Sequence, residues 1–270
     1  MKNIVMLGAG NVATHLGMAL KEAGYNIVQV FSRTERSASQ LAGRLATEYT
    51  NDIKKITSGA DIYIIAVKDG AITTVVETLQ LVRQLADATS LQINGLIVHT
   101  SGTISIDVLK DVSENIGVFY PLQTFSKNVV ETRCSVSLLF KNIPICIEAN
   151  NKSNEDILLN LAGSISENVH LINTQQRKLL HLAAVFACNF SNHMYAVAED
   201  ILKKGNLPFD MLKPLIIETA NKIENNSPND MQTGPAIRGD QMIMVEHLEY
   251  LAELPEYREM YKLISESIST

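Results

Sequence analysis

Short apolar runs rich in Ile and Val alternate with longer amphipathic segments over the first part of the chain. Such runs are typical of buried strands, and the segments between them have the spacing of amphipathic helices. The pattern predicts strands at residues 3–8, 26–32, 60–67, 95–100, 117–120, 144–149 and 168–172. It predicts helices at residues 11–24, 35–46, 71–86 and 153–166. Unbroken apolar strands separated by helices indicate an α/β fold with a doubly wound, mostly parallel sheet.

The pattern changes from about residue 175 onward. Residues 175–205 contain no proline and are apolar nearly all the way round, which predicts one long helix buried by other helices or by a partner subunit. Further helices are predicted around residues 208–226 and 240–268. We therefore expect a Rossmann-type domain at residues 1–173, followed by an all-α domain at residues 174–270 that serves substrate binding and dimerisation.

Composition narrows the class of protein. Hydrophobic residues make up 46% of the chain and charged residues 19%, as in a globular protein with a sizeable core. A net charge of −6 without a basic run argues against nucleic-acid binding, and no apolar run is long enough to span a membrane. The cysteines Cys134, Cys146 and Cys188 have no metal-like spacing, so no metal site is expected. These features favour a cytoplasmic location.

The motif GAGNVA follows the first predicted strand and opens the first predicted helix. Gly8 permits the tight turn, Gly10 lets the backbone approach a pyrophosphate, and Ala13 allows close packing of helix on strand. The helix N-terminus offers free N–H groups to phosphates, so Asn11 and Val12 also belong to the expected nucleotide site. The alternative is a glycine turn that serves packing alone.

The end of the second strand indicates which nucleotide binds. An NAD site usually has an acidic residue there, whereas this chain has Ser32, Arg33 and Thr34. Arginine can pair with a 2′-phosphate and the hydroxyls can donate to it, so the sequence predicts NADP. The alternative for Arg33 is a solvated surface charge.

Two further loops follow predicted strands, at the edge of the sheet where open α/β sheets bind ligands. Val67 and Lys68 of VKDG are expected to border the adenosine and ribose. Thr100 and Ser101 of HTSG are expected near the nicotinamide or the substrate, with Ser101 donating to a substrate oxygen. Alternatively, these two residues only cap a helix near residue 105.

Three later motifs, FYPLQTFS, HLAAVFACNFSNH and TGPAIRGD, complete a resemblance that spans essentially the whole chain. The sequence resembles a family of NADP oxidoreductases of largely unknown substrate, which pair a Rossmann domain with an uncharacterised all-helical domain. This family is similar in plan to pyrroline-5-carboxylate reductase and the β-hydroxyacid dehydrogenases. The resemblance implies hydride transfer in a site closed by the helical domain, commonly in a homodimer. One departure is Tyr120, where the motif is expected to have His.

Catalytic candidates lie on the long predicted helix. At about 100° per residue, His181, Cys188 and Asn192 fall within about 20° of one line, with Asn189 beside them. We expect His181 to act as general acid or base, Asn189 to orient a carbonyl group and Asn192 to contact the substrate. The alternative is a buried hydrogen-bond network that joins helices.

The motif TGPAIRGD interrupts the predicted helical region. Gly234 and Pro235 are expected to form a turn that holds Arg238, whose guanidinium can bind a substrate carboxylate or the cofactor phosphate. Asp240 either caps the following helix or pairs with Arg238, and it is a candidate substrate contact. The alternative is a plain loop between helices.

Together these features predict an NADP-dependent oxidoreductase that acts on a small carbonyl, imine or hydroxyacid-type substrate, as a homodimer through the helical domain. The alternative is an NADP-binding or redox-sensing protein without catalysis.

Overall fold

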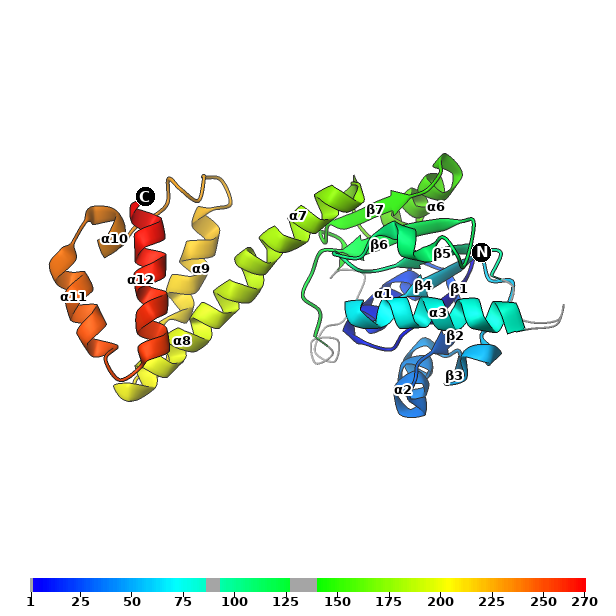
Figure 1. Ribbon diagram of the computed structural model, residues 1–270, viewed down its shortest axis with the longest axis horizontal. Helices are drawn as coiled ribbons and strands as arrows, with labels where there is room; N and C mark the ends of the chain where they lie inside the picture. Colours follow the sequence, from blue (N-terminus) through cyan, green and yellow to red (C-terminus); the bar gives the residue numbers. More distant parts are fainter. Residues whose placement is uncertain (1, 86–92, 127–139) are drawn as a thin grey trace. The chain divides into compact units, whose positions relative to one another are not determined.

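The computed structural model describes residues 2–85, 93–126 and 140–270. The chain divides into two compact units, Met1–Ala184 and Val185–Thr270. The first is an α/β unit, and the second is all-α (Figure 1).

An eight-stranded sheet with the order β3-β2-β1-β4-β5-β6-β7-β8 forms the centre of the first unit. Its strands are β1 (Asn3–Leu7), β2 (Asn26–Phe31), β3 (Glu48–Thr50), β4 (Ile62–Ile65), β5 (Leu96–His99), β6 (Ile116–Pro121), β7 (Ile145–Ala149) and β8 (Val169–Leu171). All neighbouring strands are parallel except β6 and β7, which are antiparallel. The expected mostly parallel, doubly wound sheet is confirmed. The sequence did not reveal β3, because this edge strand is short and polar.

Helices cover both faces of the sheet (Figure 1). They are α1 (Asn11–Glu22), α2 (Glu35–Leu45), α3 (Asp69–Leu85) and α6 (Lys152–Gly163). Successive side chains of a strand point to opposite faces. Ile4 and Met6 of β1 therefore pack in the same core as residues of α1, α2 and α6. Val5 and Leu7 pack in the other core, with residues of α3.

The long helix is present, but it is not a regular α-helix. α7 (Thr174–Ala184) and α8 (Ser191–Lys204) are joined by a π-helical segment, η3 (Val185–Phe190). Hydrogen bonds of a π-helix run from residue i to i+5 rather than i+4. The predicted alignment of His181 with Cys188 and Asn192 assumed a regular helix throughout, so it does not apply. Cys188 is exposed, whereas Cys146 is buried, and Cys134 lies outside the described residues.

The rest of the second unit consists of short helices. They are a 3-10 turn, η4 (Phe209–Met211), and the helices α9 (Lys213–Lys222), α10 (Pro235–Arg238), α11 (Gln241–Tyr250) and α12 (Pro255–Ser269). The helix predicted at residues 240–268 is therefore two helices, with a turn before Pro255. None of the helices in the described part of the chain has both the length and the apolar character that a bilayer crossing requires.

The two units divide after Ala184, whereas the sequence placed the domain boundary at 173/174. The two boundaries differ because α7 belongs to the first unit in the structure, whereas the sequence assigned it to the helical domain. Arg177 on this helix bonds to Ser101, Ile104 and Glu148 of the sheet unit, and His181 bonds to Tyr120. These side-chain contacts attach α7 to the first unit.

Candidate functional site

A cavity of about 640 Å³ opens beyond the carboxyl ends of β1, β2 and β4. The predicted cofactor residues line it, with the exception of Thr100; these are Gly8, Gly10, Asn11, Val12, Ser32, Arg33, Thr34, Val67 and Lys68. Lining residues that the sequence did not single out are Ala9, Phe31, Ser37, Ala66, Ala71 and Val75. Loops far apart in the sequence therefore form one hollow, at the edge where open α/β sheets bind ligands.

The two glycines of GAGNVA have different environments. Gly8 has a φ of +130°, and a Cβ there would lie 2.2 Å from the carbonyl oxygen of Ala66. Gly10 has no atom within 4 Å of the position of an added Cβ, although it lines the cavity. Gly8 is thus required by the fold itself, while Gly10 leaves space that a ligand can occupy beside the start of α1.

The motif FYPLQTFS lies against the same helix. The side-chain amide of Asn11 donates to the carbonyl oxygen of Phe125 at 2.7 Å, and Nε2 of the buried His15 lies 2.9 Å from the carbonyl oxygen of Ser126. The rings of His15 and Phe125 are 4.9 Å apart. Burial lowers the pKa of His15, which favours a neutral ring that donates to Ser126. The end of the motif is therefore fastened to α1.

The end of β2 forms the part of the cavity expected to distinguish NADP from NAD. Thr34 is the N-cap residue of α2, and its hydroxyl donates to that of Ser37 at 2.8 Å. Arg33 is exposed beside them. The cavity therefore has hydroxyl groups, a guanidinium and a helix N-terminus at this end. Ser37 was missed, although its place in the first turn after Thr34 was a usable signal.

The HTSG loop uses its hydroxyl groups internally. The hydroxyl of Thr100 donates to the carbonyl oxygen of Ile65, and Oγ of Ser101 accepts from the backbone N–H groups of Thr103 and Ile104, each at 3.0 Å. Ser101 is 3% exposed, which leaves little access for a substrate. The helix near residue 105 is a 3-10 turn, η2 (Ile106–Leu109), and Ser105 caps it. The alternative that Thr100 or Ser101 caps this helix is wrong, because the loop turns for four more residues first.

A hydrogen bond joins this loop to the start of α3. The hydroxyl of Thr103 donates to Oδ2 of Asp69 at 2.6 Å. Asp69 follows directly after Lys68, which lines the nucleotide cavity. The HTSG loop is therefore held next to that cavity, and the sequence had assigned no role to Asp69 or Thr103.

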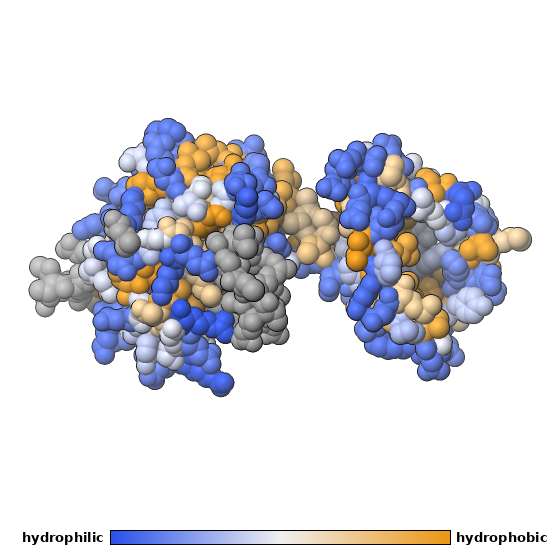
Figure 2. Space-filling model, turned by 180° about the vertical axis from the view of Figure 1, so that it is seen from behind, coloured by the Kyte–Doolittle hydropathy of each residue, from blue (hydrophilic) through white to orange (hydrophobic). Residues whose placement is uncertain are grey.

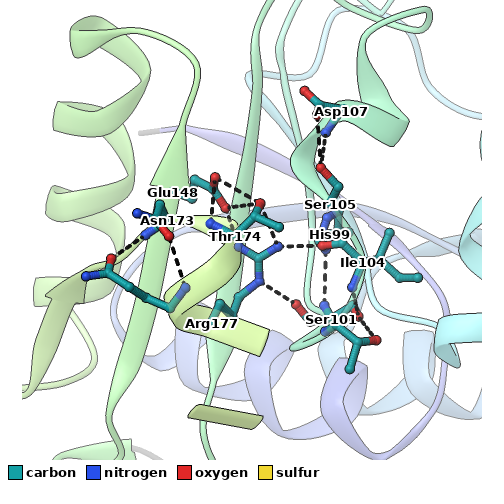
Figure 3. A network of polar contacts seen from close by, with 11 residues as sticks. His99, Ser101, Ile104, Ser105, Asp107, Glu148, Asn173, Thr174 and Arg177 are labelled. Atoms are coloured by element: carbon teal, nitrogen blue, oxygen red, sulfur yellow. Dashed lines mark hydrogen bonds and ion pairs between the residues drawn. The ribbon is translucent and has the colours of Figure 1, made fainter. Parts of the chain in front are cut away.

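A buried arginine anchors α7 to the same loop (Figure 3). The guanidinium of Arg177 is ion-paired with Glu148 on β7 and donates to the backbone carbonyl groups of Ser101 and Ile104. Glu148 also accepts bonds from the backbone and hydroxyl of Thr174, at the start of α7. An ionised pair is expensive to bury unless its hydrogen bonds are satisfied, as they are here. The pair therefore fixes α7 against the HTSG loop.

His99 lies beneath this network and is fully buried. Its Nδ1 accepts from the backbone N–H of Ser101 at 3.2 Å. Burial, together with the positive charge of Arg177, lowers the pKa of His99 to about 4, so the ring is neutral at physiological pH.

One turn along α7 from Arg177, His181 meets Tyr120 at the end of β6. The Tyr120 hydroxyl and Nδ1 of His181 are 3.0 Å apart. Gly102 lies against both, since an added Cβ would be 2.6 Å from Nδ1 of His181 and 2.9 Å from Cζ of Tyr120. Burial raises the pKa of Tyr120 to about 12, and the nearby Cys146 and Asp69 act in the same direction. The phenol therefore keeps its proton at neutral pH.

The remaining predicted site residues belong to the second unit. Asn189, in the π-helical segment, and Asn192, on α8, are exposed. Arg238 is also exposed, at the end of α10. Asp240 is the N-cap residue of α11, where its side chain accepts from the backbone N–H of Ile243. In place of the expected turn at Gly234 and Pro235, or of the alternative plain loop, the segment forms a short helix between Gly234 and Gly239, both of which have positive φ. The cavity and the contacts of Arg177, His99 and His181 all belong to the first unit.

Comparison with known proteins gives matches to both parts of the chain. A Rossmann-like domain model matches residues 2–123, and a domain of unknown function, DUF2520, matches residues 143–268. The crystal structure of a putative NADP oxidoreductase from Bacteroides fragilis is 45% identical, with a TM-score of 0.87, and the match covers 99% of this chain and 98% of that one. This chain belongs to the same family as that oxidoreductase. The family resemblance seen in the sequence is thus confirmed, with a Rossmann-like domain followed by DUF2520.

More distant structures share the fold of this family member. A protein from Thermotoga maritima is 23% identical over 99% of this chain and 100% of that one, with a TM-score of 0.75. A 1-pyrroline-5-carboxylate reductase from Streptococcus pyogenes is 13% identical over 98% of both chains, with a TM-score of 0.64. No curated protein matches the sequence.

Proposed function

We propose that this protein is an NADP-dependent oxidoreductase that transfers hydride between the nicotinamide and a small carbonyl, imine or hydroxyacid-type substrate. The observation that carries the proposal is the cavity at the start of α1, in which Gly10 leaves open space beside the helix N-terminus. The first backbone N–H groups of a helix have no intrahelical partner and can bind phosphates. The name of the B. fragilis relative supports the same class of activity.

The residues of the cavity fit a dinucleotide phosphorylated at the 2′ position. Gly10, Asn11 and Val12 would hold the pyrophosphate at the N-terminus of α1. Arg33, with the hydroxyl groups around it, would hold the 2′-phosphate at the N-terminus of α2. The acidic residue common at this place in NAD sites is absent from the residues that line this cavity.

When bound, NADP(H) would supply or accept the hydride, so the protein must hold the substrate and move a proton. His181 is the candidate proton carrier from the first unit. Asn189, Asn192, Arg238 and Asp240 remain candidates for orienting the substrate from the helical unit. Asp240 would do so while its side chain also accepts from the backbone N–H of Ile243.

The proposal is tested in two steps. Calorimetry measures the affinities for NADPH and NADH, and NADPH oxidation is then followed with a panel of small aldehydes, ketones, α-keto acids and cyclic imines. Tight NADPH binding with oxidation by any member of the panel is the expected result. Binding without oxidation would favour a non-catalytic NADP-binding or redox-sensing protein, and no binding would refute the proposal.

We also propose that the chain forms a homodimer through its helical part. Large apolar side chains are exposed along the long helix, among them Leu179 at 68%, Leu182 at 55% and Phe186 at 62%. Figure 2 shows further apolar patches on the surface of the second unit. A monomeric protein rarely exposes so many large apolar residues, whereas a second copy of the same helices would cover them.

A further inference from the structure

We propose that Tyr120 and His181 form the proton-donating pair of the reaction, with the Tyr120 hydroxyl as the group that protonates a substrate carbonyl oxygen. The sequence pointed to His181 alone and treated Tyr120 as a departure from the family motif. This inference rests on the proposed function, and it assigns that function one substrate class, the carbonyl compounds.

The position of the pair supports this role. One hydrogen bond connects the cavity wall to the loop that touches the pair: Asp69, next to the cavity residue Lys68, accepts from Thr103, and Gly102, next to Thr103, lies against both rings. Because Gly102 has no side chain, both rings reach the surface of the HTSG loop. Tyr120 and His181 are therefore an ionisable pair that touches the HTSG loop one residue from the hydrogen bond between Thr103 and Asp69.

The pair is also rigidly held on each side. Tyr120 lies opposite Cys146 in the antiparallel pairing of β6 with β7. His181 lies one turn beyond Arg177, which is bound to Glu148 on the same strand β7. A proton donor must lie within hydrogen-bond reach of the reacting atom. The strand pairing and the ion pair hold the two side chains in place.

In this proposal the proton passes from His181 through Tyr120 to the substrate oxygen. Hydride addition to the carbonyl carbon moves the electron pair of the C=O bond onto oxygen. That oxygen takes the proton of the Tyr120 hydroxyl, and Nδ1–H of the His181 imidazolium gives its proton to the Tyr120 oxygen. His181 ends neutral and recovers a proton from water, so the net consumption is one hydride and one proton per alcohol formed.

The substrate class follows from this donor. A carbonyl oxygen needs a proton during reduction, whereas an iminium nitrogen has gained its proton before hydride arrives, so it needs no acid in that step. The guanidinium of Arg177 is already ion-paired with Glu148, so it does not serve a substrate carboxylate. Beside the HTSG loop, Tyr120 therefore offers an acid for a carbonyl group, while the guanidinium of Arg177 is not available to a charged substrate.

A second pair of the same kind provides the control. In the helical unit, Nδ1 of His247 lies 2.9 Å from the hydroxyl of Tyr261. Tyr120→Phe and Tyr261→Phe each remove one hydroxyl from a tyrosine–histidine pair. Gly102→Ala keeps both groups of the first pair but forces them apart, because its Cβ would lie too close to each ring.

The first measurement needs no substrate. In protein labelled with ¹⁵N-histidine, the Nδ1 resonance of His181, assigned by its loss in His181→Gln, should shift in Tyr120→Phe and Gly102→Ala but not in Tyr261→Phe. It should shift again when NADP⁺ binds to the unaltered protein. A resonance that responds to neither Tyr120→Phe nor NADP⁺ would overturn the proposal, even if no substrate is ever found.

The second measurement uses any carbonyl compound and any cyclic imine that the panel identifies. Tyr120→Phe should lower kcat for the carbonyl compound by roughly 10²-fold or more, with NADPH affinity unchanged. The factor by which Tyr120→Phe lowers kcat for the imine should be at least tenfold smaller. Tyr261→Phe should leave kcat unchanged for both substrates. If Tyr120→Phe lowers kcat equally for both substrates, or does not lower it for the carbonyl compound, Tyr120 is not the proton donor for a carbonyl group. NADPH binding without any turnover would instead refute the proposed function, and the resonance of His181 would then decide whether the pair exists at the site.

Discussion

The side chain of Asn11 donates to the carbonyl oxygen of Phe125 at 2.7 Å, across a separation of 114 residues. This bond ties the loop of the FYPLQTFS motif to the first residue of the nucleotide-binding helix. The bond therefore places the end of the motif, five residues after Tyr120, beside a residue that lines the cavity.

Asn11→Ala should therefore weaken NADPH binding without unfolding the protein. Loss of one exposed hydrogen bond corresponds to about 1 kcal/mol, or roughly fivefold in the dissociation constant. Calorimetry measures the change. The control is Asn26→Ala. Asn26 begins β2, away from the cavity, and its side chain donates to that of Asn3 at 2.8 Å. If both variants bind NADPH equally well, Asn11 does not shape the site.

The two glycines of GAGNVA should respond differently to substitution. Gly8→Ala combines a strained φ with a clash against Ala66, and we expect it to lower the free energy of unfolding by roughly 3 kcal/mol. Gly10→Val places its side chain in open space, so stability should change little while NADPH binding is lost. Urea denaturation and calorimetry on the same preparations separate the effects. Retained NADPH binding in Gly10→Val would mean that the loop is only a turn.

Arg33 should determine the choice between the two nucleotides. Arg33→Asp replaces a cation with a carboxylate that repels a 2′-phosphate and can accept bonds from a ribose hydroxyl. The ratio of NADP to NAD affinity should fall by about tenfold to a hundredfold, as expected for loss of a charged hydrogen bond. Arg36→Asp makes the same change of charge at a residue that does not line the cavity. An affinity ratio as strongly altered in Arg36→Asp as in Arg33→Asp would show only a general charge effect.

Stability should fall in mild acid because of His99. The pKa of this buried ring is about 4, below the value of about 6.5 for an unfolded chain. In that interval the unfolded state binds a proton that the folded state does not, so stability declines as the pH falls from 6.5 toward 4. The loss due to His99 is roughly 3 kcal/mol, and the lowered pKa of His15 adds to it in the same direction.

Urea denaturation of His99→Gln between pH 4 and 7 measures this contribution. The variant is less stable at neutral pH, but its stability should depend less on pH than that of the unaltered protein. His170→Gln, at an exposed histidine, is the matched control and should keep the original dependence. If the free energy of unfolding of His99→Gln depends on pH as steeply as that of the unaltered protein, His99 is not the source of the acid sensitivity.

Dimerisation is tested on the exposed apolar residues of the long helix. Phe186→Glu places a charge on a side chain that is 62% exposed in the single chain. If a second copy covers it, sedimentation should show a dimer for the unaltered protein and a monomer for the variant. Leu81→Glu, at a 52% exposed position on α3, should remain dimeric. A monodisperse monomer of the unaltered protein would exclude the dimer.

Most strands and helices, in their succession along the chain, and the glycine loop at Gly8 could be predicted from sequence because each depends on local properties. Apolar runs predict buried strands whatever lies around them, and a glycine at a tight turn is required by its own backbone. The residues 67–68 and 32–34 were found by the same reasoning, since they follow directly after strands whose carboxyl ends share one edge of the sheet.

Tertiary structure alone decided the rest of the candidate site. Tyr120 and His181 are 61 residues apart, and they meet only because β6 pairs antiparallel with β7, on which Glu148 holds Arg177. Nothing in the sequence around Arg177 distinguishes a fully buried arginine from an exposed one. The π-helical turn at Val185–Phe190 likewise breaks a helical spacing that looked regular. Contacts between distant segments depend on strand order and packing, and the pattern of apolar and polar residues does not encode these residue by residue.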